Sequence, residues 1–150
     1  MTDTELIEAL AAKLRAYATA PLASLEVHEW EQAGLENTTG SVVVDIDQGS
    51  QSHIALGDDP ESMEDAIALS ITGIVPHADS QANRRNVVTL REQIVAVLRQ
   101  NRALTAGGEN ATTNAREPIG WSYLLAAEGE RSKRACVVTV TYRKTPDAAS

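Results

Sequence analysis

The segment from Lys133 to Lys144 alternates between apolar and polar side chains, and this alternation constrains the fold more than any other feature. Side chains two residues apart share one face of a β-strand, so this segment has one apolar face and one polar face. The expected inward set is Cys136, Val138, Val140 and Tyr142, and the outward set is Thr139, Thr141 and Arg143. A half-buried strand needs partner strands and a layer that covers its apolar face.

Four further segments read as strands, over residues 25–30, 41–47, 64–75 and 120–128. Residues 25–30 and 41–47 show the same alternation. In residues 64–75 the β-branched and other large apolar side chains share one side of a strand, whereas a helix would scatter them around its axis. Pro76 ends this strand. The last two strands pair as a hairpin around residues 128–132.

Two segments show helical spacing instead. Residues 3–18 follow a capping-box pattern of Thr2 and Glu5, and residues 82–102 follow Asp79 or Ser80 as a cap. The expected buried stripes are Leu6, Leu10, Leu14 and Tyr17 in the first helix, and Val87, Leu90, Ile94, Val97 and Leu98 in the second.

Between these elements, residues 34–40 and 48–62 read as polar loops. Residues 105–118 contain almost nothing to bury and read as a long mobile loop that orders only on assembly. The tail, residues 145–150, is expected to be flexible. We therefore predict one α+β domain over residues 1–150, a mixed, largely antiparallel sheet of about five strands with two main helices packed on one face.

Composition limits the function classes. With 43% hydrophobic and 23% charged residues the chain resembles ordinary globular proteins, and the absence of Phe makes the core aliphatic. One cysteine excludes an internal disulfide and a four-cysteine zinc site. No apolar run is long enough to cross a membrane and no signal peptide is apparent, so we expect a soluble protein of the cytoplasm.

Charge is divided sharply along the chain. Residues 1–83 contain 15 acidic residues against Lys13 and Arg15, a net charge of −13, whereas residues 84–150 have a net charge of +5. Overall acidity disfavours a general nucleic-acid binder. Two interpretations stay open: the opposite charges meet inside one folded chain, or they form different faces through which neighbouring copies attract.

The motifs of common enzymes are absent, and no catalytic, cofactor-binding or metal-binding residue is assigned. Asp45 and Asp47 do not continue into a calcium loop and read as the solvent face of a strand. The three histidines lie in separate segments. Cys136 reads as a buried, inert thiol, and Trp30 and Trp121 read as core or partly buried packing residues rather than an aromatic stacking platform.

Charged clusters supply the candidate interface residues. The basic candidates lie on the second helix and at the hairpin tip, and the acidic ones lie in the polar loop before the third strand. They are Arg84, Arg85, Arg131, Lys133 and Arg134 on one side and Asp58, Asp59 and Glu61 on the other. Our hypothesis pairs the basic group of one copy with the acidic group of the next.

The order of elements resembles the tail terminator proteins of long-tailed bacteriophages, also called minor tail or tail completion proteins. The segments that carry this resemblance are ELIEALAAKLRAYA, SVVVDID, DAIALSITGIVP, NVVTLREQIVAVLRQN and GWSYLLAAEGERSKRACVVTVTYRKT. The last segment carries most of it, because an aromatic-led strand, a charged turn and an ending such as VTVTYR are typical of that family. The similarity covers most of residues 3–144 and is one of architecture, so no binding residue is carried over.

The resemblance implies a structural virion protein rather than an enzyme, with no cofactor. Family members form a hexameric ring on the tail tube, stop its polymerisation and present a surface to the head-completion or neck proteins. DNA would pass through the lumen of such a ring without sequence-specific binding. The implied location is the virion tail, reached from the host cytoplasm during assembly.

Three alternatives stay open. The chain could be another neck or head–tail joining protein, or a small cytoplasmic binding domain. It could also be an enzyme whose site combines Asp45, Asp47 and His53 with the acidic loop. The partner bound, the oligomeric state and the effect of a chelator on stability separate these alternatives.

Overall fold

The computed structural model of the chain describes residues 1–30, 40–53, 63–75, 80–114, 117–128 and 131–146, with residues 80, 125–128 and 131–133 described by their backbone alone. The described residues form α1 (Asp3–Arg15), a short 3-10 helix η1 (Leu22–Ser24), β1 (Glu26–Glu29), β2 (Ser41–His53), β3 (Met63–Ile74), α2 (Ser80–Gln100), β4 (Ala103–Ala106), β5 (Glu109–Thr112), β6 (Gly120–Glu128) and β7 (Arg131–Lys144). No described helix is long and apolar enough to span a membrane.

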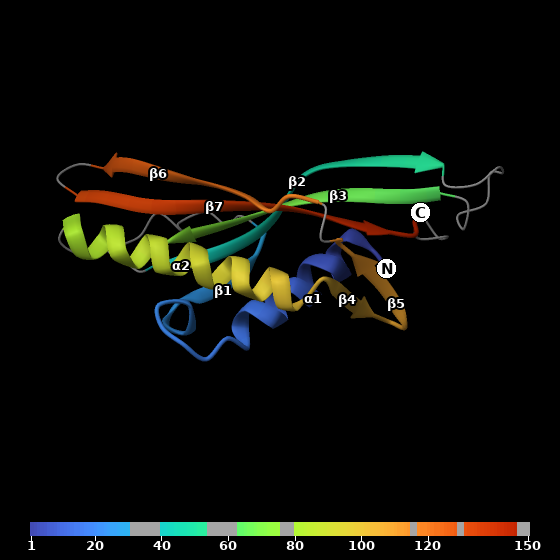
Figure 1. Cartoon of the computed structure of the whole chain (residues 1–150), viewed down its shortest axis with the longest axis horizontal. Helices are drawn as coiled ribbons and strands as arrows, with labels where there is room; N and C mark the ends of the chain where they lie inside the picture. The colour runs from blue at the N-terminus through green and yellow to red at the C-terminus, as the bar shows by residue number, and fades with distance from the viewer. Residues whose placement is uncertain (31–39, 54–62, 76–79, 115–116, 129–130, 147–150) are drawn as a thin grey trace.

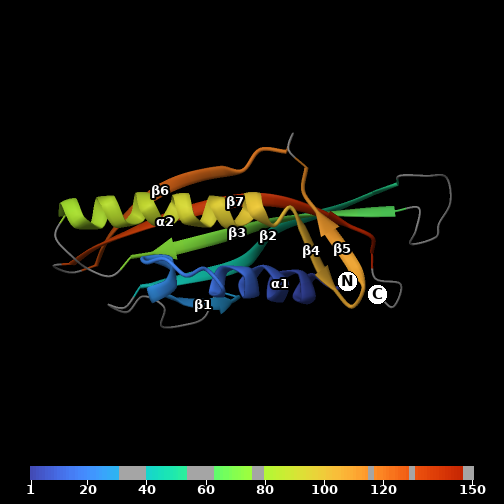
Figure 2. The same ribbon diagram turned by 60° about the horizontal axis from the view of Figure 1, so that its bottom comes forward.

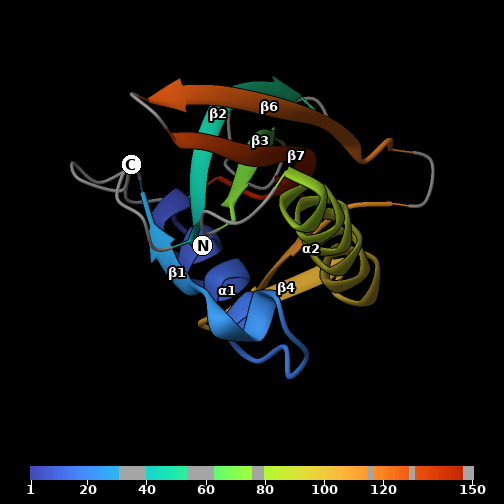
Figure 3. The same ribbon diagram turned by 90° about the vertical axis from the view of Figure 1, so that its left-hand side faces the viewer.

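The strands form one twisted sheet of seven strands, with α1 and α2 on the same side of it (Figures 1 and 3). The order of hydrogen-bonded strands is β1-β2-β3-β7-β5-β4. Strand β6 also pairs with β7, on the same edge as β5: β6 pairs with residues 131–139 of β7, and β5 pairs with Arg143 near its end. Among the described strands only β1 and β2 pair in parallel, and the other pairs are antiparallel. The predicted α+β class and mixed sheet are confirmed, but the sheet has seven strands rather than five.

The predicted apolar stripes form the core between helices and sheet. Thr2 caps α1, because its side-chain oxygen accepts a hydrogen bond from the Glu5 amide at 3.1 Å, and α1 ends at Arg15, earlier than predicted. The predicted stripe of α2 is buried throughout, and the predicted inward residues of β7 are each at most 2% exposed. This burial orients α2 along β7 and β3, with Arg84, Arg85 and Arg99 exposed and Arg91 only partly so.

The prediction that the second strand ends at residue 47 is wrong. β2 continues to His53 and pairs with β3 as far as Met63, after a β-bulge between Ile46 and Gln48. Residues 47–53 are exposed, so no apolar alternation marks them as a strand. We call residues 47–53 and 63–66 the β2–β3 arm; it projects beyond the ends of both helices (Figures 1 and 2).

The mobile loop predicted over residues 105–118 is also wrong, because a β-hairpin occupies its first part. In this hairpin Ala103 of β4 faces Thr112 of β5, and the pairing continues to Ala106 facing Glu109. The turn contains Gly107 and Gly108, both with positive φ. Leu104 and Ala111 are fully buried against the core. Two buried side chains are enough to hold a short hairpin onto a larger core, so this segment does not depend on assembly for its order.

Burial raises the pKa of the Cys136 thiol from 9.0 to about 11, and burial likewise raises the pKa of Tyr142 to about 12. The pKa of the Cys136 thiol is higher in the folded chain than in the unfolded chain. The neutral thiol therefore contributes fully to the free energy of unfolding below about pH 9, and this contribution is lost as the pH rises through 11. At pH 11 we expect the Cys136 contribution to the free energy of unfolding to have fallen by about 2 kcal/mol.

Urea unfolding at pH 8 and pH 11 measures this loss, with Cys136→Ala as the comparison. The variant should lose about 2 kcal/mol less between the two pH values than the unmodified chain. Equal losses in both proteins would show that Cys136 does not ionise on alkaline unfolding.

Candidate interaction surface

Large apolar side chains are exposed where α2 meets β6. Trp121 is 45% exposed, Tyr123 43% and Val88 38%. Leu124, 53% exposed, lies opposite Ala135 and therefore on the other face of the sheet. In isolated soluble proteins, exposed apolar side chains that gather in one region mark an interaction site more often than scattered ones do. We call Arg84, Arg85, Val88, Arg91, Trp121 and Tyr123 the α2–β6 surface.

Arg91 organises the centre of the α2–β6 surface. Its guanidinium carbon lies 4.3 Å from the centre of the Trp121 ring, and its Nε donates a hydrogen bond of 2.9 Å to the Tyr123 hydroxyl. The guanidinium therefore lies over one aromatic ring and is hydrogen-bonded to a second aromatic side chain. Trp, Tyr and Arg are the residue types that most often dominate binding energy at protein interfaces.

An open hollow of about 440 Å³ continues this surface along α2. Arg84, Arg85, Val88 and Thr89 line it. Both arginines are exposed, and no acidic side chain of the described residues lies within ion-pair distance of either one. The hollow thus combines the apolar side chain of Val88 with two cations that form no ion pair with an acidic side chain in the described part of the chain.

The register of β6 explains why its aromatic residues are exposed. Trp121 lies opposite Val138 and Tyr123 opposite Cys136, so both aromatic side chains are on the helix-bearing face of the sheet. Helix α2 packs over β7 and β3, however, and β6 lies at the edge beyond it (Figure 2). Of the predicted core or partly buried positions, the core is excluded for both tryptophans: Trp121 is 45% and Trp30 37% exposed, so each is only partly buried.

The structure brings three of the five basic candidates to one end of the molecule. Arg84 and Arg85 lie near the start of α2, and Arg134 lies near the start of β7 at the same end (Figure 1). Arg131 and Lys133 belong to the same part of β7, but only their backbone is described. Asp58, Asp59 and Glu61 lie outside the described residues.

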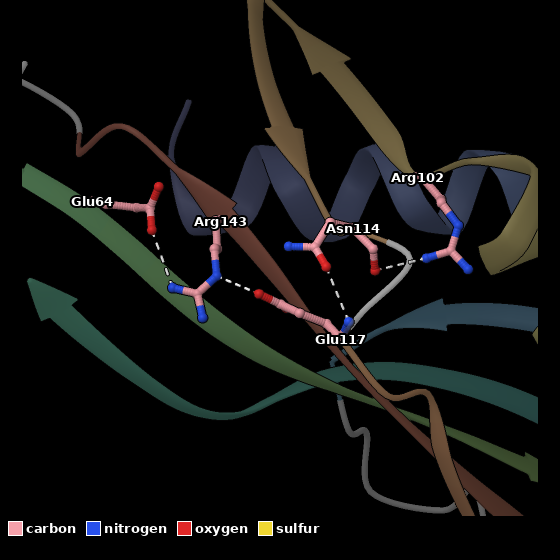
Figure 4. A network of polar contacts seen from close by, with 5 residues as sticks. All are labelled: Glu64, Arg102, Asn114, Glu117 and Arg143. Atoms are coloured by element: carbon pink, nitrogen blue, oxygen red, sulfur yellow. Dashed lines mark hydrogen bonds and ion pairs between the residues drawn. The ribbon is translucent and has the colours of Figure 1, made fainter. Parts of the chain in front are cut away.

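A second charged cluster joins the two halves of the chain near the opposite end. Arg143 forms ion pairs with Glu117 and with Glu64, the latter at 3.1 Å (Figure 4). Hydrogen bonds to both carboxylates raise the pKa of Arg143. The Glu117 amide donates to the Asn114 side chain at 3.1 Å, and Arg102 donates to the Asn114 carbonyl at 3.0 Å. This cluster fastens residues 114 and 117 to the sheet.

Lys144 forms a similar bridge beside it. Its ammonium group lies 3.0 Å from an Asp3 oxygen and 3.4 Å from an Asp65 oxygen, and its side chain is only 3% exposed. Basic residues of the C-terminal half thus neutralise acidic residues of the N-terminal half within one chain. The first interpretation of the charge split is correct at this end, whereas the α2–β6 surface keeps cations that these bridges do not reach.

The residues considered for an enzyme site do not converge in the described parts of the chain. No group of three or more His, Cys, Asp or Glu side chains is placed to hold a metal ion there. Asp45 accepts a hydrogen bond from the Ile46 amide at 2.7 Å, while Asp47 and His53 are exposed along β2. Cys136 is buried, as predicted, and its raised pKa keeps the thiol protonated.

Comparison with known proteins gives no family assignment: no protein-family model matches the chain, and no curated protein matches it.

Proposed function

We propose that the chain is a structural protein of a long-tailed bacteriophage, a tail terminator that forms a homohexameric ring on the tail tube. In this proposal the ring stops polymerisation of the tube and offers its other side to a head-completion or neck protein. DNA passes through the lumen without sequence-specific binding. The resemblance stated above suggests this function, and the α2–β6 surface is the observation that supports it best.

The α2–β6 surface supports assembly rather than catalysis for a physical reason. Trp121 and Tyr123 are exposed in a single chain, and the Arg91 side chain, which is only 17% exposed, holds both of them in place. Such a cluster gains free energy when a partner covers it, because apolar area leaves water and the guanidinium is already oriented. A ring of identical subunits uses one such surface per subunit against a different surface of the next.

Light scattering on a sizing column, over a hundredfold concentration range and at low and high salt, tests the ring. We expect a species of six subunits, 96 kDa from a chain of 16.0 kDa, that is favoured by concentration and weakened by salt. A strictly monomeric protein that also fails to bind purified tail tubes would contradict the proposal.

The partner separates a terminator from a neck protein. Pull-down with purified tail tubes and with purified capsid connectors should recover the chain on tubes. Recovery on connectors alone would assign it to the neck, and recovery on neither, by a monomer, would favour a cytoplasmic binding domain. Growth of tubes beyond their normal length without the protein, and restoration by its addition, would demonstrate termination directly.

A further inference from the structure

Helix α1 and the α2–β6 surface lie toward opposite edges of the sheet, on its helix-bearing side. Helix α1 packs beside β1, whereas β6 lies at the other edge beyond α2 (Figure 3). The outward face of α1 and the α2–β6 surface therefore lie apart within one chain, and only a second copy can bring them together. We propose that the outward face of α1 of one copy packs on the α2–β6 surface of the next copy. This inference rests on the proposed ring and names the contact that builds it.

The outward face of α1 has an acidic part and a small, uncharged part. It consists of Glu5, Glu8, Ala12 and the C-cap residue Ala16, which we call the α1 face. These residues follow one another at spacings of three or four, so they share one side of the helix, and the buried stripe of α1 lies on the other side. Glu8, Ala12 and Ala16 are exposed, and Glu5 is partly exposed. The α1 face therefore presents two carboxylates followed by a flat patch of alanines.

Charge complementarity argues for this occupant. Within the described residues, neither Glu5 nor Glu8 forms an ion pair. Arg84 and Arg85 likewise form no ion pair with an acidic side chain in the described part of the chain. Two carboxylates on one copy thus match two guanidinium groups on the next, and opposite potentials favour this contact between copies.

The cations of α1 leave the charge of the α1 face in place. Arg15 is paired with Glu29 of β1 at 3.0 Å. Lys13 follows Glu8 by five residues and therefore lies about 140° around the helix from it. The α1 face keeps its negative charge, because neither cation lies over its glutamates.

The spacing of the charged and uncharged parts agrees on the two sides of the contact. Along α2, Arg84 and Arg85 precede Arg91 by six or seven residues, which corresponds to about 10 Å along the helix. Along α1, the midpoint of the two glutamates precedes the midpoint of the two alanines by about 11 Å. Parallel helices thus bring the carboxylates to the arginines and the alanines to Trp121 and Tyr123. Alanine side chains leave room for these bulky rings to pack closely.

The contact is heterologous, because the α1 face and the α2–β6 surface are different parts of the chain. Repeating it head to tail gives a ring, provided that the rotation between copies closes. Every subunit then uses one α1 face and one α2–β6 surface, and none remains free in the closed ring.

Two complementary charge-reversal variants test the contact. The first, Arg84→Glu/Arg85→Glu, makes the α2–β6 surface acidic, and the second, Glu5→Lys/Glu8→Lys, makes the α1 face basic. Each variant alone places like charges opposite each other. An equimolar mixture restores opposite charges at every contact of a ring in which the two variants alternate.

Sedimentation equilibrium at several concentrations measures the assembly. We expect each variant alone to self-associate at least about tenfold more weakly than the unmodified chain, and the mixture to recover to within about threefold of it. High salt should reduce these differences. Circular dichroism checks that each variant is folded; Glu5→Lys keeps the cap of α1, because Thr2 accepts from the backbone amide of residue 5. Glu8→Lys alone provides the same test with a single substitution at an exposed position.

The matched control is Glu26→Lys/Asp47→Lys, which makes the same change of charge at two exposed residues of β1 and β2. This control should self-associate like the unmodified chain, and it should fail to restore assembly of the first variant.

A mixture that stays as dissociated as its two components would overturn the α1 contact. If the unmodified chain nevertheless forms the six-subunit species in light scattering, the ring stands and is built through another contact. An unmodified chain that remains monomeric would overturn the α1 contact as well, and binding to tail tubes then decides separately on the proposed function.

Discussion

Trp121→Ala should weaken self-association of the chain about thirty-fold or more, which corresponds to about 2 kcal/mol for an interface residue of this type. The indole supplies the ring against which Arg91 lies at 4.3 Å, so its removal loses both apolar area and the orientation of the guanidinium. Sedimentation equilibrium at several concentrations measures the change. Because Trp121 is 45% exposed, the variant should keep the folded circular dichroism spectrum.

Trp30→Ala is the matched control for this prediction. Trp30 is 37% exposed, and it follows β1, which lies at the other edge of the sheet from β6. Its replacement should leave self-association unchanged. Equal weakening by both substitutions would show that exposed tryptophans act non-specifically and would remove the α2–β6 surface from the assembly.

A milder variant isolates the polar part of the cluster. Tyr123→Phe removes only the hydroxyl that accepts the 2.9 Å hydrogen bond from Arg91. We expect it to weaken self-association about fivefold, in keeping with about 1 kcal/mol for one hydrogen bond. Its effect should largely disappear in an Arg91→Ala background, because the two side chains then no longer interact.

Gly73→Val should lower the free energy of unfolding by about 3 kcal/mol. A Cβ atom at Gly73 would lie 2.6 Å from Leu90 Cδ2 and 3.1 Å from Cys136 Sγ. Leu90 and Cys136 are fully buried, so the surrounding core cannot yield without moving α2 away from β3. Urea unfolding followed by circular dichroism measures the loss.

Gly49→Val and a double variant control this prediction. A Cβ atom at Gly49 meets only the end of the Ile67 side chain at 3.2 Å and a backbone oxygen at 3.8 Å, on the exposed arm, so the loss there should stay below about 1 kcal/mol. Leu90→Ala should cost about 3 kcal/mol alone, but clearly less in the Gly73→Val background, where it relieves the clash. Strict additivity would mean that the two positions do not press on each other.

Gly73 also connects the core to the proposed function. The absence of a side chain at Gly73 lets Leu90 sit directly on β3, and Arg91 is the next residue of α2. The same close approach therefore sets the position from which Arg91 reaches Trp121 and Tyr123 on β6. A substitution that lifts α2 should disturb both stability and self-association, whereas Trp121→Ala should disturb only self-association.

The β4–β5 hairpin and the distal half of β2 could not be predicted from the sequence for related reasons. Each consists largely of small or polar residues, and the alternation that marks a strand arises only where one face is buried. In the hairpin, only Leu104 and Ala111 are buried, too few to show a period. Along the arm, pairing with β3 supplies the hydrogen bonds without any buried face, so backbone pairing alone makes it a strand.

The sequence by itself determined the elements that bury apolar side chains: α1 and α2 with their stripes, β3, the β6–β7 hairpin and the burial of Cys136. It did so because burial imposes a period of 3.6 or 2 residues on the pattern of apolar side chains. Only the tertiary structure decided that β6 lies beyond the cover of α2, and hence that Trp121 and Tyr123 remain exposed beside Arg91. Exposure depends on which strand occupies an edge, and strand order is set by contacts between segments far apart in the chain.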